Sequence, residues 1–246
     1  MKKYSILFIG NSYTFYNGMP KLLEALAASA GYEVEVDSVT KGGYRLSQLA
    51  DPENEHGKRV EARLTGEKKY DFVVLQEQSL APAFANAGGF FDAARNLAER
   101  IRTAGAEPVL YSTWGRETGH PALATYGWTS EVMTWRLAAA YRAIGEELGL
   151  RVADVGLAFY SVYTGDTGIG VYHTDSTHPS YAGSYLAAAT LFSKIFDTGA
   201  TLCTYFGDLD PETARTLLAT AERTVTSPPT IPEEYKVSSV GVHKKE

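Results

Sequence analysis

A serine, a histidine and an aspartate, the three residue types that together attack a carbonyl group, occur at two places in this sequence. Ser12 directly follows a short apolar run, residues 6–9, and Asp175 and His178 stand three residues apart near the other end of the chain. A serine hydroxyl is a weak nucleophile unless a base takes its proton and a third group orients that base. We therefore expect Ser12 to act as nucleophile, His178 as its base and Asp175 as the orienting acid, if the fold brings them together.

Such a serine also needs hydrogen-bond donors for the charge that develops on the carbonyl oxygen. The candidates are the backbone amides of Ser12 and Gly43 and a side-chain amide of Gln76 or Gln78. The pair Gly42-Gly43 suits a backbone that approaches a substrate closely, because no side chain blocks the amide.

The elements that must position these residues are predicted by alternating apolar runs and helical patterns, which indicate an α/β fold with a parallel sheet of about five strands covered on both faces. Several of the runs are continuously apolar, as in strands buried on both faces. The predicted strands are residues 5–9, 33–37, 72–75, 108–111 and 151–154, and the predicted helices are residues 20–30, 90–104, 131–148, 180–196 and 211–224. Gly31, Gly105 and Gly149 follow three of these helices, as C-terminal caps do.

Ser12, Gly43, Gln76 and Gln78 each follow the end of a predicted strand. In an open parallel sheet the ligand binds outside the carboxyl ends of the strands, where the strand order reverses. The sequence therefore predicts that these residues share one edge of the sheet.

Each residue also has an ordinary explanation when it is taken alone. A serine between a strand and a helix is most often a cap or turn residue. Asp175 and His178 fit a helix-start pattern, the glycine pair fits a simple turn, and Gln76 fits a buried amide that pairs with backbone. The set as a whole is what favours catalysis.

The same residues resemble the motifs of the SGNH/GDSL hydrolases. Gly10-Asn11-Ser12 is similar to the block that carries the nucleophile, Gly42-Gly43 to the block whose glycine donates to the oxyanion hole, and Asp175-x-x-His178 to the block of acid and base. The resemblance extends to about residue 200. It implies a flavodoxin-like three-layer α/β/α sandwich, hydrolysis of an ester, and neither a metal nor an organic cofactor.

The third block of that family departs from its usual pattern here. Where the family has an asparagine donor, this chain has Gln76-Glu77-Gln78. A glutamine at this place resembles the carbohydrate acetylesterase branch, so Gln76 is our first choice for the donor and Gln78 the second. The chain is also similar to an uncharacterised bacterial branch with the same glutamines.

For the substrate we expect a small ester, a short acyl group and above all acetyl on a carbohydrate. Tyr44 and Trp114 are the candidates for lining its pocket, although most aromatic residues simply pack on a sheet. The loop of residues 112–128 is long enough to form one wall of that pocket.

Alternative functions are a lipase- or thioesterase-type acylhydrolase, a non-catalytic carbohydrate-binding module, and a flavodoxin-like phosphate binder. The last is disfavoured because residues 10–14 contain no glycine-rich phosphate loop.

Composition limits the remaining classes. The chain has 246 residues, 44% of them hydrophobic, and a net charge of −6 without a basic cluster, so we expect no nucleic-acid partner. Its apolar runs are too short for a membrane span or an export signal, which predicts a cytoplasmic protein, with a processed secreted form as the alternative. The single cysteine, Cys203, is interpreted as a core thiol. We expect one domain, residues 1–225, followed by an extended C-terminal tail, residues 226–246; a homo-oligomer is compatible with the sequence.

Overall fold

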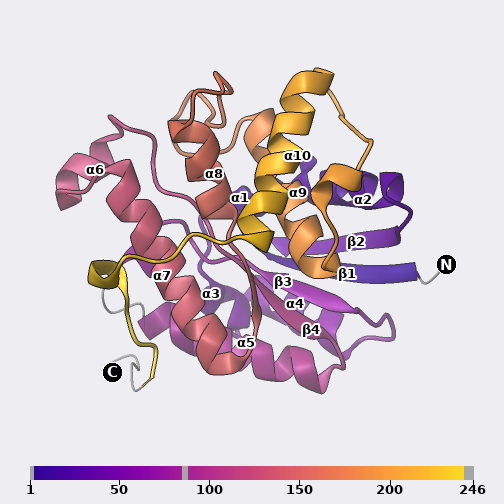
Figure 1. Cartoon of the computed structure of the whole chain (residues 1–246). Coiled ribbons are helices and arrows are strands. Elements are labelled where there is room, and N and C mark those ends of the chain that lie inside the picture. The colour runs from indigo at the N-terminus through magenta and orange to yellow at the C-terminus, as the bar shows by residue number, and fades with distance from the viewer. Residues whose placement is uncertain (1–2, 85–87, 241–246) are drawn as a thin grey trace.

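The core of the structure is a five-stranded sheet in which every neighbouring pair of strands is parallel. The computed structural model describes residues 3–84 and 88–240. The strand order is β2-β1-β3-β4-β5, so the chain moves outward from β1 to β2 and then returns to the other side of β1; Figure 1 labels the first four strands. The strands are β1 (Lys3–Gly10), β2 (Glu33–Thr40), β3 (Phe72–Leu75), β4 (Glu107–Tyr111) and β5 (Arg151–Ala153). All five correspond to predicted strands, which confirms the α/β fold class.

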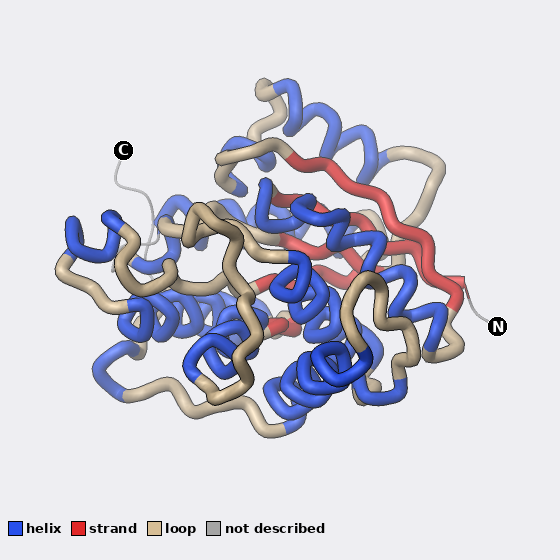
Figure 2. The backbone as a smooth tube through the Cα atoms, turned by 90° about the horizontal axis from the view of Figure 1, so that it is seen from above, coloured by secondary structure: helices blue, strands red, loops and turns tan. Residues whose placement is uncertain are grey.

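Helices cover both faces of the sheet, and the three layers are visible in Figures 1 and 2. Alternate residues of β1 point to opposite sides, as the period of a strand requires. Ile6 and Phe8 belong to one apolar cluster, whereas Leu7 and Ile9 belong to the other. The first cluster includes residues of α2 (Met19–Ser29), α8 (Val155–Thr164), α9 (Tyr181–Phe196) and α10 (Pro211–Thr226), and the second includes residues of α3 (Leu46–Ala50), α4 (Glu55–Thr65), α5 (Gly88–Thr103) and α7 (Ser130–Leu148). Both faces of the central strands are therefore buried.

The helices that the sequence predicted have strongly apolar stripes. They are α2 (Met19–Ser29), α5 (Gly88–Thr103), α7 (Ser130–Leu148), α9 (Tyr181–Phe196) and α10 (Pro211–Thr226). Gly31, Gly105 and Gly149 follow three of them with φ values of +86°, +84° and +60°, a conformation that favours glycine. Their interpretation as helix-ending residues is confirmed.

Five further helices have no counterpart among the predicted elements. Four of them are short or have few buried positions: in α4 the buried residues are only His56, Gly57, Val60 and Leu64. The exception is α8, in which six of the ten residues are buried. The five helices are α1 (Ser12–Phe15), α3 (Leu46–Ala50), α4 (Glu55–Thr65), α6 (Pro121–Tyr126) and α8 (Val155–Thr164), and single 3₁₀ turns lie at Tyr16–Gly18, Ala81–Ala83, Ala200–Leu202 and Glu233–Tyr235.

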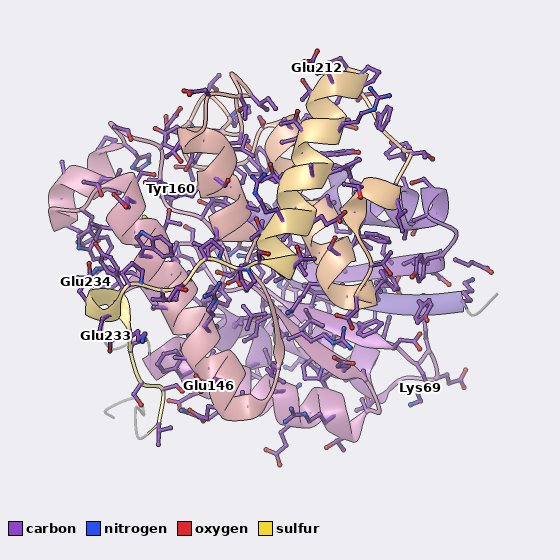
Figure 3. All side chains as sticks on the ribbon, in the orientation of Figure 1. Lys69, Glu146, Tyr160, Glu212, Glu233 and Glu234 are labelled. Atoms are coloured by element: carbon purple, nitrogen blue, oxygen red, sulfur yellow. The ribbon has the colours of Figure 1, made fainter. Side chains whose placement is uncertain are left out.

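The segment after α10 lies along α7. Ile231 is buried in a small cluster with α7 and α8 residues, and Arg142 of α7 donates a hydrogen bond to the carbonyl oxygen of Pro229 at 2.7 Å. Charged side chains such as Lys69, Glu146, Glu212, Glu233 and Glu234 lie at the periphery (Figure 3). The division into a domain and a tail stays a prediction.

Cys203 is 3% exposed and belongs to the larger apolar cluster, so its interpretation as a core thiol is confirmed. Burial raises the pKa of this thiol to about 11, although a hydrogen bond with Ser29 opposes the shift. Within residues 3–84 and 88–240, no helix combines the length and the apolar character needed to cross a membrane.

Candidate active site

Ser12, His178 and Asp175 form a continuous chain of hydrogen bonds. Ser12 Oγ lies 2.9 Å from His178 Nε2, and His178 Nδ1 lies 2.5 Å from Asp175 Oδ2. An ionised carboxylate can only accept, so Nδ1 carries the hydrogen and Nε2 is left to accept from the serine hydroxyl. The fold therefore brings Ser12 into contact with a histidine that follows it by 166 positions in the sequence.

Asp175 is held ionised by the turn in which it sits. Its partial burial acts to raise its pKa, but hydrogen bonds from the His178 ring and from the backbone N–H groups of His178 and Thr177 lower that pKa to about 2. Oδ1 accepts both backbone bonds, at 2.9 and 3.0 Å. Ser176, with φ +57°, makes this turn tight, and its hydroxyl donates to Glu117 at 2.6 Å.

Ser12 is fixed at the carboxyl end of β1 by its two preceding residues. Asn11 caps the short helix α1 by accepting from the Tyr13 N–H, and its side-chain nitrogen donates to the Tyr44 carbonyl oxygen at 2.9 Å. An added Cβ on Gly10 would lie 2.6 Å from both Gln76 Oε1 and Thr14 Oγ1. Only glycine fits between these two side chains, so the strand end is specified by packing as well as by chemistry.

Gln76, our first choice for the side-chain donor, does not reach the surface. It is 0% exposed; its Oε1 accepts from Asn11 N–H and Thr14 Oγ1, each at 2.9 Å, and its Nε2 donates to the Glu77 carbonyl oxygen. Because its side chain is fully buried and its Nε2 donates to the backbone of Glu77, it is a scaffold residue of the serine loop. The structure does not support it as a donor to substrate.

Gly43, Ser12 and Gln78 retain donor groups. Gly43 has φ +75° in the turn closed by Tyr44 N–H and the Lys41 carbonyl oxygen. Among the residues that the structure describes, no acceptor pairs with the N–H of Ser12 or of Gly43. Gln78 is half-buried; its Oε1 accepts from Leu80 and Ala81, while its Nε2 makes only a 3.4 Å contact with Ser79.

Trp114, expected to line the substrate pocket, is instead part of the core. It is 1% exposed and lies between the rings of Tyr13 and Phe159, with centroid distances of 4.4 and 4.3 Å and nearly parallel planes. Its indole N–H donates to the Thr177 carbonyl oxygen at 3.1 Å. The prediction of a lining role was wrong, because the ring faces the sheet and only its nitrogen meets the loop of Asp175 and His178.

Aromatic rings also hold the imidazole of His178, and one of them gave no signal in the sequence. Tyr16 stacks on the His178 ring at 4.3 Å and 13°, and Tyr13 meets it edge-on at 5.6 Å. Asn17 joins the same two loops by donating to the carbonyl oxygen of Pro179 at 3.1 Å. A tyrosine four residues after a serine is common, so only the fold reveals Tyr16.

A pocket of about 830 Å³ lies beside the proposed donors. Gly43 and Gln78 belong to its lining, whereas Ser12, His178, Asp175 and Tyr44 do not. Tyr44 packs against the His56 ring at 5.2 Å, so its expected lining role lacks support. The other lining residues are charged or polar and apolar side chains in about equal number: Arg45, Ser47, Ala50, Asp51, Glu77, Leu80, Ala81, Phe84, Gly89, Phe90, Asp92, Ala93, Asn96 and Tyr126.

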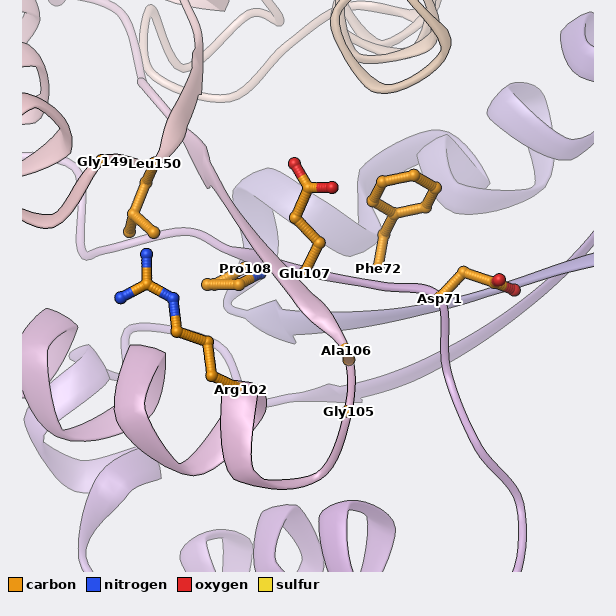
Figure 4. A pocket seen from close by; sticks show the side chains of 9 residues that line it. All are labelled: Asp71, Phe72, Arg102, Gly105, Ala106, Glu107, Pro108, Gly149 and Leu150. Atoms are coloured by element: carbon orange, nitrogen blue, oxygen red, sulfur yellow. The ribbon is translucent and has the colours of Figure 1, made fainter.

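A second cavity, of about 490 Å³, lies at the opposite edge of the sheet, where β3 and β4 begin. Figure 4 shows Asp71, Arg102 and Glu107 around it, and it contains none of the predicted site residues. In the described part of the chain, no group of three or more histidine, cysteine or acidic side chains is arranged to hold a metal ion.

Neither a family model nor a curated protein matches the chain. A solved structure from Slackia heliotrinireducens, assigned to the SGNH hydrolases, is 34% identical, covers 79% of this chain and 100% of its own, and superposes with a TM-score of 0.69. A DUF4886 family protein from Bacteroides uniformis is 18% identical, covers 99% and 100%, and has a TM-score of 0.75.

An acetylxylan esterase from Geobacillus stearothermophilus shares the fold at 17% identity, with 76% and 92% coverage and a TM-score of 0.50. The identity to the Slackia protein extends over that protein's whole chain. We conclude that this chain belongs to the SGNH hydrolases, a family of enzymes that hydrolyse ester bonds, as its sequence motifs indicated.

Proposed function

We propose that this hydrolase removes a short acyl group, acetyl above all, from a carbohydrate, with Ser12, His178 and Asp175 as its catalytic triad. The observation that carries the proposal is the unbroken series of contacts from Ser12 Oγ through the His178 ring to Asp175. A nucleophile, a base and an orienting carboxylate at hydrogen-bond distance are the arrangement that acyl transfer through serine requires.

In the first half of the reaction, Ser12 Oγ forms a bond to the carbonyl carbon while His178 Nε2 takes the hydroxyl proton. The N–H groups of Ser12 and Gly43, with the side-chain amide of Gln78 as a third donor, stabilise the oxyanion. When the intermediate collapses, the bond to the leaving alcohol breaks and His178 returns the proton to that oxygen.

In the second half, water attacks the acyl-enzyme and gives its proton to His178. The carbon–oxygen bond to Ser12 breaks, the carboxylic acid leaves, and Ser12 recovers its proton. Asp175 stays ionised throughout because its low pKa keeps the carboxylate ready to stabilise the imidazolium.

The pocket beside Gly43 supports a carbohydrate rather than a long acyl chain. Its charged and amide side chains, among them Arg45, Asp51 and Asn96, offer the donors and acceptors that sugar hydroxyls need. Tyr126, 41% exposed, adds an aromatic surface at its rim. A long acyl chain would displace water from these polar groups and offer them no hydrogen bonds in return, which is costly.

The triad is tested with Ser12→Ala. Turnover of p-nitrophenyl acetate should fall at least about a thousandfold, while the melting temperature changes little, because the variant removes the nucleophile and leaves the fold. Ser38→Ala is the matched control, since Ser38 is an exposed residue of β2. A fluorophosphonate should label the wild type and not the Ser12 variant; retained turnover in Ser12→Ala would show that the nucleophile lies elsewhere.

The substrate is tested by comparing acetylated xylo-oligosaccharides with p-nitrophenyl esters of increasing acyl length. Tyr126→Ala should raise KM for the acetylated sugar about tenfold and leave p-nitrophenyl acetate turnover unchanged, because only the sugar reaches the rim of the pocket. Arg102→Ala, in the cavity of Figure 4, is the control. A preference for octanoyl over acetyl esters would contradict the carbohydrate proposal.

A further inference from the structure

Glu77 is a buried carboxyl group whose partners are backbone amides. It is 1% exposed, and within the described residues no cation lies within ion-pair distance of it. Its two oxygens accept from the Leu46 N–H, each at 3.2 Å, and Oε1 also accepts from the Gln78 N–H at 2.5 Å. A carboxylate is expensive to bury, so its retention here needs an explanation.

The amides that Glu77 binds belong to the two segments that carry the proposed oxyanion donors. Leu46 begins α3, three residues after Gly43, and Gln78 is the side-chain candidate itself. On its other side, the Glu77 N–H donates to the hydroxyl of Tyr141 on α7 at 3.0 Å, which fixes the end of β3. One side chain therefore connects the turn of Gly43 to the segment of Gln78.

We propose that the ionised carboxylate of Glu77 is a positioning group that keeps Gly43 and Gln78 in place for the oxyanion, so that protonation of Glu77 lowers catalysis. Both partners are N–H groups and can only donate. A protonated carboxyl keeps one carbonyl oxygen as acceptor but has lost its negative charge, so the hydrogen bonds from the Leu46 and Gln78 N–H groups are no longer charge-assisted and hold the two segments less firmly. This inference rests on the proposed esterase function and on the role of Gly43 in it.

Burial places the titration of Glu77 in a useful pH range. It raises the pKa of Glu77 to about 7, although the amides of Gln78 and Leu46 and the charge of Arg45 act to lower it. The groups that face Glu77 are Arg45, from the loop before α3, and Tyr141, from α7. Asp51 and Asp92 are further charged residues that line the same pocket.

The test is the steepness of the pH–rate profile for p-nitrophenyl acetate. In the wild type, loss of activity on acidification needs two protonations, of the histidine base and of Glu77, so the slope of log kcat/KM against pH should approach two. In Glu77→Gln the slope should fall to one, and kcat at pH 8 should fall at least about a hundredfold, as for the loss of an oxyanion donor, with little change in KM. A wild-type slope of one that the variant leaves unchanged would overturn the proposal.

Tyr141→Phe is the matched control, because it removes a hydrogen bond from the Glu77 backbone and keeps the carboxyl. It should lower the melting temperature and retain the slope of two. If Glu77→Gln does not fold, a ¹³C NMR titration of glutamate carboxyls in the wild type replaces it, and a Glu77 midpoint near that of free glutamate, about 4.3, would refute the idea. Retained turnover in Ser12→Ala would instead refute the esterase mechanism, so the two failures are distinguishable.

Discussion

At the scale of single residues, Trp114 connects the core of the molecule to the loop that carries the base. Its ring stacks between Tyr13 and Phe159, and its N–H donates to the Thr177 carbonyl oxygen, one residue before His178. Tyr13 directly follows Ser12 in the sequence, so the Trp114 side chain contacts a neighbour of Ser12 and a neighbour of His178. Its effect on catalysis is therefore through the position of these two residues.

We expect Trp114→Phe to lower kcat about tenfold with little change in KM, because the loop of His178 loses its hydrogen bond and part of its packing. The free energy of unfolding should fall by about 1–3 kcal/mol for the smaller ring and the lost bond. Trp135→Phe is the matched control, since the indole nitrogen of Trp135 on α7 makes only a 3.5 Å contact with Glu131. Equal effects of the two substitutions on kcat would contradict a positioning role for Trp114.

The sequence could identify those residues whose types rarely occur together at such spacing by chance. Ser12, Asp175 and His178 have types and spacing that are informative in the sequence itself. Tyr16, which stacks on the imidazole, and Glu77, which accepts from two loops, depend on contacts between distant segments. Gln76 was misjudged as a donor because its burial beneath Asn11 and Thr14 is a property of packing.

At the scale of elements, the junction of β1 and α1 fixes the serine against the neighbouring strand β3. Gly10 ends β1, and Gln76, directly after β3, reaches across to Asn11 and Thr14. The two strand ends are therefore joined by a side chain rather than only by ladder hydrogen bonds. Any side chain at position 10 must displace Gln76 or Thr14.

We expect Gly10→Ala to lower the free energy of unfolding by roughly 1–3 kcal/mol and to reduce esterase activity, because its Cβ would lie 2.6 Å from two oxygen atoms. Gly170→Ala is the control, since a Cβ there meets no atom within 4 Å and its φ is not positive. Urea denaturation of both variants checks the prediction. If Gly10→Ala were as stable as Gly170→Ala, the junction would have to be far more adaptable than its packing indicates.

Elements were predictable where burial imposes a pattern along the chain. The strands are apolar because both of their faces are covered, and the long helices have apolar stripes that face the sheet. Helices α1, α3 and α6 are too short to develop such a stripe, and they lie after strands or in loops around the site. Those short helices are held by caps and tertiary contacts, which local sequence does not report.

At the scale of the whole molecule, the strand order decides where the site lies. Because β2 and β3 pair on opposite sides of β1, the connections from β1 and β3 leave the sheet toward opposite layers. The crevice between them is the usual place for a ligand in such sheets. Ser12 after β1, Gly43 after β2 and Gln78 after β3 all lie at the carboxyl ends of neighbouring strands, so the parallel topology brings together loops that are far apart in sequence.

The burial of Cys203 has a practical consequence for fluorescence measurements. A thiol that is 3% exposed, with a pKa of about 11, reacts very slowly with maleimides at neutral pH. A second cysteine placed at the exposed Gln48 position of α3 would then be the reactive one, and an environment-sensitive dye there would sit close to the Gly43 turn. Stopped-flow traces of such a conjugate would time the arrival of an ester substrate at this turn separately from the release of its products.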